Sequence, residues 1–367
     1  MGFIMIQSID GNSFASDHRQ KWFGVITLIV CIGILWGLLM PAVNTRTRES
    51  PRRTQCLNNI KNLALATINF EVAKKQYPGY QASFGKREDG STKIGSWVVS
   101  LLPMLEQQAL RDHWDDPTTH DAWLAAVRDQ DKESLAAFYP TINVFSCPSD
   151  TSRQAEFAGM SYAANAGFQL LPNDPALGLK LYATVEDASK RSVISQRAAN
   201  GLFANRLGPE VIDPQTGMPA KVFGYSENRI SNDHVRDGTS QTLMFAEHCN
   251  NLNWRDYSIA DDSSRYQLGV VWLYAGKSAS ADRPQPLAVT DDMRINHHKL
   301  LPGSGPRRAR PSGMHQGIVV AAFADGSTKQ IDEGIDYQVY QSLMAPQDAT
   351  SDIPNLNYEL RKEDYVN

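Results

Sequence analysis

The stretch "HQGIVVAAFADGSTKQI", residues 315–331, decides how the C-terminal half of the chain is interpreted. Ile318–Ala324 has the length and apolarity of a strand, and it ends at Asp325-Gly326, which suits a tight turn because both residues tolerate left-handed backbone angles. A strand rises about 3.3 Å per residue, so His315 and Asp325 lie on the order of 30 Å apart. Proton transfer needs a separation of about 3 Å. The stretch therefore predicts a β-hairpin with a two-residue turn, and His315 is a strand-end anchor opposite Asp336.

A second Asp-Gly pair, Asp237-Gly238, opens the similar stretch "RDGTSQTLMFAEH". Both pairs are interpreted as turns beside strands, although carboxylates and carbonyls in such loops can also bind calcium, which is the less favoured alternative. Further strands are expected in "INVFSCP", "QTLMFAEH" and "YQLGVVWLYA", from their length and residue types. The stretch from about 169 to 230 is weakly patterned and is expected to form loops.

The N-terminal part of the chain has a different pattern. Residues 22–43, "WFGVITLIVCIGILWGLLMPAV", carry no charge, and twenty-two residues form roughly 33 Å of helix, enough to cross a bilayer. A cleavable signal has a shorter apolar stretch and a small-residue cleavage site, so the segment is expected to be a retained anchor. Lipid is then one partner of the chain.

An amphipathic helix is predicted after this segment. Its apolar face carries residues at steps of three and four: Cys56, Ile60, Leu63, Thr67 and Phe70. With the anchor it forms one long helix, interrupted at Pro51 because proline removes a backbone hydrogen bond. Helices first and strands afterwards indicate the α+β class. The expected organisation is a cytoplasmic segment at 1–21, a transmembrane helix at 22–43, an amphipathic extension at 44–78 and an α+β domain at 79–367.

Composition excludes few classes of function. The net charge of −4 and the lack of a basic, aromatic-rich face argue against nucleic acid as a partner. Cys56, Cys147 and Cys249 are far apart and have no zinc-finger spacing, so an exported domain would hold one disulfide and one free thiol among them. The histidines also lack a metal-binding spacing, and no cofactor or resident metal is predicted.

Several blocks together resemble one large bacterial family. The spacing His315, nine residues, Asp325-Gly326 is similar to its C-terminal signature, and other matching blocks occur in order along the chain: "GILWGLLMPAV", "RRTQCLNNIKNLALATINF", "SWVVSLLPMLEQQAL", "FSCPSD", "SYAANAG" and "VRDGTSQTLMFAEH". That family has a prepilin-type N-terminus and a domain of unknown function, number 1559, also labelled solute-binding-like. The matches span about residues 33–331.

The resemblance implies a pilin-like fold, in which a long N-terminal transmembrane and amphipathic helix packs on an antiparallel β-sheet domain. It implies a single-pass protein of the inner (cytoplasmic) membrane with the C-terminal domain outside the cytoplasm, although the arginines after the span would by themselves favour the opposite orientation. It also implies that Cys56 and Cys147 form the disulfide. One departure concerns the peptidase recognition site, where Gly24 stands in place of the usual glutamate. An uncleaved, singly anchored protein is therefore expected, whereas fibre assembly stays an open question at this point.

Three functions are carried forward from the sequence. The leading hypothesis is a non-enzymatic, pseudopilin-like envelope protein with a structural or interaction role, whose partners include other envelope proteins. The alternative is a surface-exposed module that binds a solute or glycan through the aromatic residues Trp254, Tyr257 and Trp272. A metal-dependent hydrolase would need three histidines to converge on a polar pocket: His248, His297 and His298.

Overall fold

A computed structural model describes most of the chain: residues 13–39, 46–119, 140–151, 159–169, 196–249, 257–277, 286–297, 305–355 and 358–365, with single positions at 122, 126, 129 and 254. The chain divides into two compact units, Met1–Pro51 and Arg52–Asn367. Each unit is described by itself. The stretch "TTHDAWLAAVRDQDKESLAAFYP", residues 118–140, predicts a helix from its threonine cap and its closing proline, but it lies almost wholly outside the described residues.

Helix α1 (Ser13–Leu39) belongs to the first unit. Its side chains are described over residues 21–36 and are exposed. Across the described part of the chain, no helix combines the length and the apolarity needed to cross a membrane. The predicted transmembrane helix over residues 22–43 is therefore wrong, and the pilin-like description that depends on it is corrected to α+β with several sheets.

Helix α2 (Arg46–Lys74) has one buried face. Cys56, Ile60, Leu63 and Thr67 are fully buried, as their spacing predicts. Pro51 lies inside α2 without ending it, so the predicted interruption there is wrong. The buried face packs into the larger of the hydrophobic cores and so positions the helix on the body of the protein.

The central element is a five-stranded sheet in the order β10-β9-β7-β3-β8. Neighbouring strands are antiparallel except β3 and β8, which are parallel, so the predicted purely antiparallel sheet is corrected to a mixed one. The alternation of side chains along each strand gives the sheet two buried faces. Its strands are β3 (Tyr162–Gln169), β7 (Leu243–Glu247), β8 (Gly269–Leu273), β9 (Ile318–Phe323) and β10 (Thr328–Asp332).

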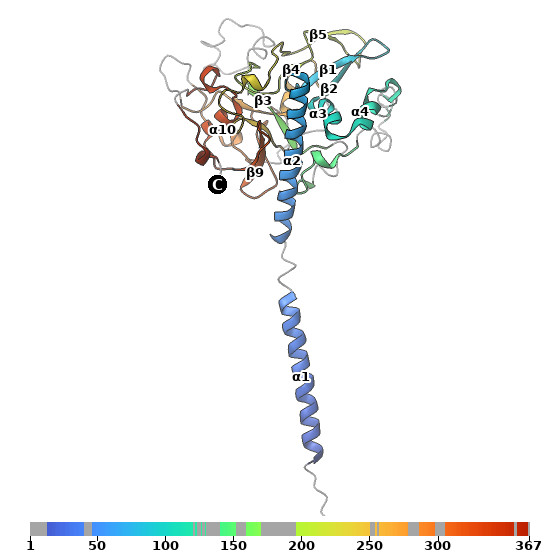
Figure 1. Ribbon diagram of the computed structural model, residues 1–367, viewed down its shortest axis with the longest axis vertical. Coiled ribbons are helices and arrows are strands. Elements are labelled where there is room, and N and C mark those ends of the chain that lie inside the picture. The colour runs from blue at the N-terminus through green and yellow to red at the C-terminus, as the bar shows by residue number, and fades with distance from the viewer. Residues whose placement is uncertain are drawn as a thin grey trace, which may run out of the picture. The chain divides into compact units, whose positions relative to one another are not determined.

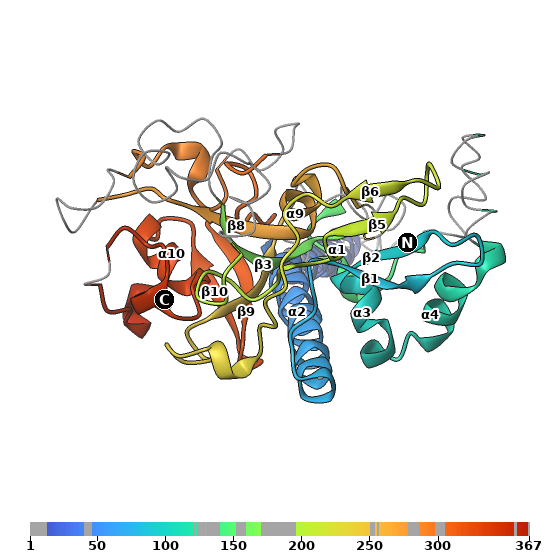
Figure 2. The ribbon, with the colours of Figure 1, turned by 90° about the horizontal axis from the view of Figure 1, so that it is seen from above.

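Each face of the sheet is covered by a different helix. Val320 and Ala322 of β9 belong to the same core as α2, whereas Val319 and Ala321 belong to a second core with helix α10 (Tyr337–Met344). Figures 1 and 2 show α2 between the part that contains α10 and the part that contains α3 and α4. The apolar strands are thus buried on both sides, which explains their nearly unbroken hydrophobic sequences.

Apart from α2, α10 and the central sheet, the second unit consists of short elements. Two small sheets have the orders β2-β1-β4 and β5-β6. The segment "INVFSCP", predicted as a strand, contains instead a 3-10 helix, η3. The remaining elements are β1 (Gln81–Lys86), β2 (Thr92–Ser96), β4 (Asn205–Arg206), β5 (Glu210–Ile212), β6 (Pro219–Lys221), α3 (Trp97–Leu101), η2 (Leu102–Leu105), α4 (Gln108–Asp115), η3 (Asn143–Phe145), η4 (Asn232–His234), α9 (Ser263–Leu268), η5 (Asp291–Met293), η6 (Asp348–Thr350) and η7 (Lys362–Asp364).

Strands β9 and β10 form the hairpin expected at residues 315–331, with one difference in register. Ala322 pairs with Thr328, and the Phe323 amide donates to the Ser327 carbonyl, so the loop has three residues and not two. Gly326 supplies the left-handed position with φ 82°. This is the usual arrangement of a three-residue hairpin loop. The predicted pairing of Ala324 with Ser327, and of His315 with Asp336, is therefore wrong by one residue.

Asp325 stabilises this turn, because its Oδ1 accepts a hydrogen bond of 2.8 Å from the Ser327 amide. We expect Asp325→Ala to lower the free energy of unfolding by about 0.5–1.5 kcal/mol, since that hydrogen bond is lost. Asp325→Asn retains an acceptor and should stay within about 0.5 kcal/mol of the parent. Urea denaturation of the three proteins measures the difference. Equal destabilisation by both substitutions would contradict this role of Asp325.

Candidate functional site

Four side chains that can bind a metal or carry a proton meet beneath α2. Cys56 of α2 is disulfide-bonded to Cys147, with their Cα atoms 5.0 Å apart. His315 Nε2 lies 3.6 Å from Cys147 Sγ and 3.2 Å from Glu247 Oε1. The four residues are at most 2% exposed. Each offers one ligand atom, and these atoms all lie within 4.8 Å of one another.

The surrounding elements hold each of these residues in place. Asn59, less than one turn after Cys56, donates to the carbonyls of Asn143 and Ser146 and so fixes the segment that contains Cys147. The Val320 amide of β9 donates 2.8 Å to Glu247 Oε2 at the end of β7. A Cβ atom at Gly313 would stand 2.3 Å from Glu247 Oε2, so only glycine fits beside this carboxylate. The close approach brings the segment before β9, with His315, against β7.

The structure thus separates the two residues that opened the sequence analysis. His315 is a buried anchor at the entry to β9, but its partner is Glu247 of the neighbouring strand β7 and not a residue of β10. Asp325 is exposed in the turn at the other end of β9. The meeting of Glu247 with the cysteine pair was not predicted from the sequence. No spacing signals that meeting, because the four residues come from four separate segments.

The chemistry open to the oxidised cluster is limited. The sulfur atoms are bonded to each other, so neither can act as a nucleophile or a metal ligand. All four side chains are shielded from solvent, which leaves no space for a substrate beside them. In this state the cluster joins α2, the segment after η3, β7 and the entry to β9. Its role in the oxidised protein is structural.

The other predicted turn is also bound into the body. Gly238 adopts φ 105°, as a turn glycine can, and Asp237 Oδ2 accepts a short hydrogen bond from the Asp348 amide. Burial, followed by the nearby Asp237 carboxylate, raises the pKa of Asp348 to about 7. Burial also raises the pKa of Asp237. Among the described residues neither Asp237 nor Asp325 belongs to a group of three or more potential metal ligands, so the geometry offers no support for the calcium alternative.

The aromatic residues proposed for solute binding are not on an open surface. Trp254 and Trp272 are fully buried, and the Trp272 indole N–H donates to the Asn200 carbonyl. Tyr257 packs at the edge of a small core around Val211. These rings fill the interior and do not form a stacking platform.

The histidines of the hydrolase hypothesis do not form a described centre. His248 Nε2 lies 3.2 Å from the Arg308 carbonyl, and its side chain is buried. His297 is partly exposed, and its amide donates to the Arg294 carbonyl. His298 lies outside the described residues. Neither of the two cavities characterised in the second unit has a histidine in its lining.

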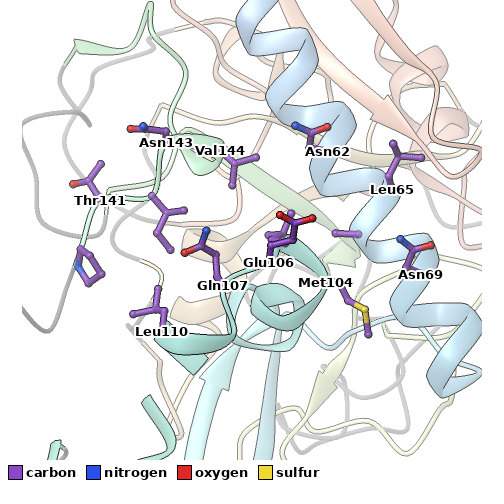
Figure 3. A pocket seen from close by; sticks show the side chains of 14 residues that line it. Asn62, Leu65, Asn69, Met104, Glu106, Gln107, Leu110, Thr141, Asn143 and Val144 are labelled. Carbon is purple, nitrogen blue, oxygen red and sulfur yellow. The ribbon is translucent and has the colours of Figure 1, made fainter. Parts of the chain in front are cut away.

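One of these cavities is an open groove of about 630 Å³ beside α2. Figure 3 shows Asn62, Leu65 and Asn69 along α2, with Glu106 and Gln107 nearby and Asn143 and Val144 at another side. Amide and aliphatic side chains dominate the lining, and there is no aromatic ring among them. We call this cavity the α2 groove. Its lining is Asn62, Leu65, Ala66, Asn69, Met104, Leu105, Glu106, Gln107, Leu110, Pro140, Thr141, Ile142, Asn143 and Val144.

The fold and this site define an α+β protein whose helix α2 is joined to the rest of the second unit by a buried disulfide. A family model for proteins of unknown function, DUF1559 (SBP_bac_10), matches residues 45–338, and the chain belongs to that family. This confirms the resemblance at the level of the family, whereas the prepilin-type N-terminus and the histidine–aspartate signature stay predictions. No curated protein and no solved structure matches the chain.

The disulfide encloses a long loop, since its cysteines are 91 residues apart. Loop-closure entropy predicts that replacing both cysteines by serine lowers the free energy of unfolding by about 4.6 kcal/mol. The exposed Cys31 supplies a control, and Cys31→Ser should leave stability unchanged. Guanidinium denaturation of both variants measures the effect. A loss below about 1 kcal/mol for the double variant would contradict a structural role.

The Asp348 carboxyl predicts a pH dependence of stability. Its folded pKa of about 7 lies above its ordinary value of 3.8, so its contribution is fully present below pH 3.8 and is lost as the pH rises through 7. Asp348→Asn should therefore be more stable than the parent at pH 8, on the order of 2 kcal/mol, with the difference shrinking toward pH 4. Thermal denaturation between pH 4 and 8 measures this. The exposed Asp325→Asn serves as control, and an equal pH effect there would refute the assignment.

Proposed function

We propose that this protein is a non-catalytic interaction protein of the cell envelope, whose body works outside the cytoplasm and holds a polypeptide partner in the α2 groove. The observation that carries the proposal is the composition of that groove. It combines amide groups, aliphatic side chains and an open shape, without a convergent set of catalytic residues in its lining. Membership of the DUF1559 family is compatible with an envelope or solute-binding-like role.

The location outside the cytoplasm is supported by the Cys56–Cys147 disulfide. Disulfides persist in oxidising compartments and are rare where glutathione and thioredoxin keep thiols reduced. This bond is fully buried and links two segments on which the body depends. A chain that reached its folded state in the cytoplasm would lack this connection.

The partner class follows from the hydrogen-bonding groups in the groove. Asn62, Asn69 and Gln107 each offer both a donor and an acceptor, as the peptide backbone does. Leu65 is 44% exposed beside them and offers an apolar contact for a partner side chain. An extended polypeptide presents both kinds of group in alternation, and it therefore fits this lining better than a charged ligand.

A neutral solute is the second candidate, because the volume of the groove lies within the usual range of small-molecule sites. Such ligands are usually oriented by aromatic surfaces, and the α2 groove has none. A glycan would therefore depend on the amide groups alone. Calorimetric titration with neutral oligosaccharides distinguishes the two candidates, since the peptide hypothesis expects no heat of binding.

The test uses two substitutions on the exposed side of the same helix. Asn69→Lys places a long cation in the groove, whereas Val72→Lys changes a side chain that is 58% exposed and outside the lining. We expect Asn69→Lys to weaken partner binding at least about fivefold, and Val72→Lys to leave it unchanged. Cross-linking in native envelopes, with identification of the linked peptides, finds the partner, and titration of that peptide measures binding.

Both variants should melt at the temperature of the parent, because neither position is buried. Cross-links that join the partner to a surface away from Asn69 would contradict the proposal. An Asn69→Lys protein that binds the partner as strongly as the parent would contradict it too.

A further inference from the structure

The buried cluster beneath α2 has the composition of a metal centre once its disulfide is opened. Two sulfur atoms, one imidazole nitrogen and one carboxylate oxygen are four ligands of the kinds that zinc takes. We propose that the reduced protein binds one zinc-class divalent cation through four atoms: Cys56 Sγ, Cys147 Sγ, Glu247 Oε1 and His315 Nε2. The cluster is then a two-state site that holds either a disulfide or a metal ion.

Two of the distances around His315 already match such a centre. Zinc bonds of about 2.3 Å to sulfur and about 2.0–2.1 Å to nitrogen or oxygen give tetrahedral ligand separations of roughly 3.6 Å for N···S and roughly 3.3 Å for N···O. The structure has 3.6 Å from Nε2 to Cys147 Sγ and 3.2 Å from Nε2 to Glu247 Oε1. The two bonded sulfur atoms must separate to roughly 3.8 Å, a movement that rotation of the cysteine side chains would supply.

The neighbours of the four ligands would orient them for this purpose. The Val320 amide occupies Glu247 Oε2, which leaves Oε1 directed at His315. Among the described residues no hydrogen bond of good geometry reaches Oε1. The Tyr162 hydroxyl donates to the Cys56 carbonyl and fixes the backbone of that ligand. Hydrogen-bonded second neighbours of this kind are a regular feature of protein metal sites.

The step between the two states balances with an external dithiol as the reductant. A thiolate of the dithiol attacks one sulfur atom of the Cys56–Cys147 bond, and the second thiolate of the dithiol then resolves the mixed disulfide. Two electrons pass from the dithiol to the cysteine sulfur atoms, so Cys56 and Cys147 become thiols and the dithiol becomes a disulfide. The cation then displaces the two thiol protons to the solvent and bonds to both thiolates. Two thiolates and one dication together carry no net charge. The disulfide that they replace is neutral as well, so the switch adds no uncompensated buried charge.

The experiment uses the full chain with Cys31→Ser and Cys249→Ser, which leaves only the pair of the cluster. This protein is reduced with a dithiol, freed of reductant under anaerobic conditions and titrated with Co²⁺, whose bonds to thiolate give charge-transfer absorption. We expect one equivalent of Co²⁺ to bind with thiolate absorption, Zn²⁺ to displace it, and Zn²⁺ to raise the melting temperature of the reduced protein. The oxidised protein should show none of these effects.

Glu247→Gln is the decisive variant, since it keeps an acceptor for the Val320 amide but removes the charged ligand. Its reduced form should bind Zn²⁺ at least about tenfold more weakly than the parent, and its oxidised form should remain folded by circular dichroism. Asp150→Asn, at another buried carboxylate, is the matched control and should leave Zn²⁺ affinity unchanged.

Three results would overturn the proposal. The first is a reduced protein without thiolate absorption on addition of Co²⁺, and the second is equal binding by the oxidised protein. The third is an undiminished Zn²⁺ affinity of Glu247→Gln. Each result leaves the groove proposal untouched, because the α2 groove contains none of the four ligands.

Discussion

The connection between Cys56 and Cys147 is the constraint on which the second unit depends. Apart from the disulfide, helix α2 is held on the sheet by its apolar face and by side-chain hydrogen bonds, such as those from the Tyr162 hydroxyl to the Cys56 carbonyl and from Arg53 to Gln330. The disulfide joins it covalently to the segment after η3, and Asn59 adds two hydrogen bonds to the same segment. Glu247 and His315 then bring the strands β7 and β9 into the same cluster. One buried point therefore fixes four segments that are distant in sequence.

Local patterns were sufficient to predict elements whose sequence and environment agree. The buried face of α2 follows from the spacing of Cys56, Ile60 and Leu63, and the hairpin follows from an apolar run before Asp325-Gly326. Its register did not follow, because tertiary contacts decide it. The amides of Ala324 and Asp325 donate to the carbonyls of Thr242 and Thr239, and these bonds hold a loop of three residues. A rule that considers only the two central turn residues cannot include such contacts.

Strand β3 shows why other elements were missed. Its sequence, "YAANAGFQ", is rich in alanine, asparagine and glycine, which are poor strand formers. Between β7 and β8 the small side chains become an advantage, since a Cβ atom at Gly201 would stand 2.3 Å from the Gly167 Cα. The cost of burying the Asn165 side chain is offset by its hydrogen bonds to the carbonyls of Leu243 and Met344. The segment before Cys147 shows the opposite error, in which a strand was predicted and none is present. Its sequence is typical of a strand, but it forms a 3-10 helix beside the disulfide.

The candidate sites could be predicted from sequence only in part, since both depend on convergence in space. The turn residues Asp237 and Asp325 were found because a turn is local, whereas the partnership of Glu247 with His315 required the order of the strands. Helix α2 connects the two sites. Cys56 faces the buried cluster, while Asn62 and Asn69 line the groove on its exposed side. A helix that is fixed from within presents its outer side chains in one arrangement, which lowers the entropic cost of ordering them around a partner.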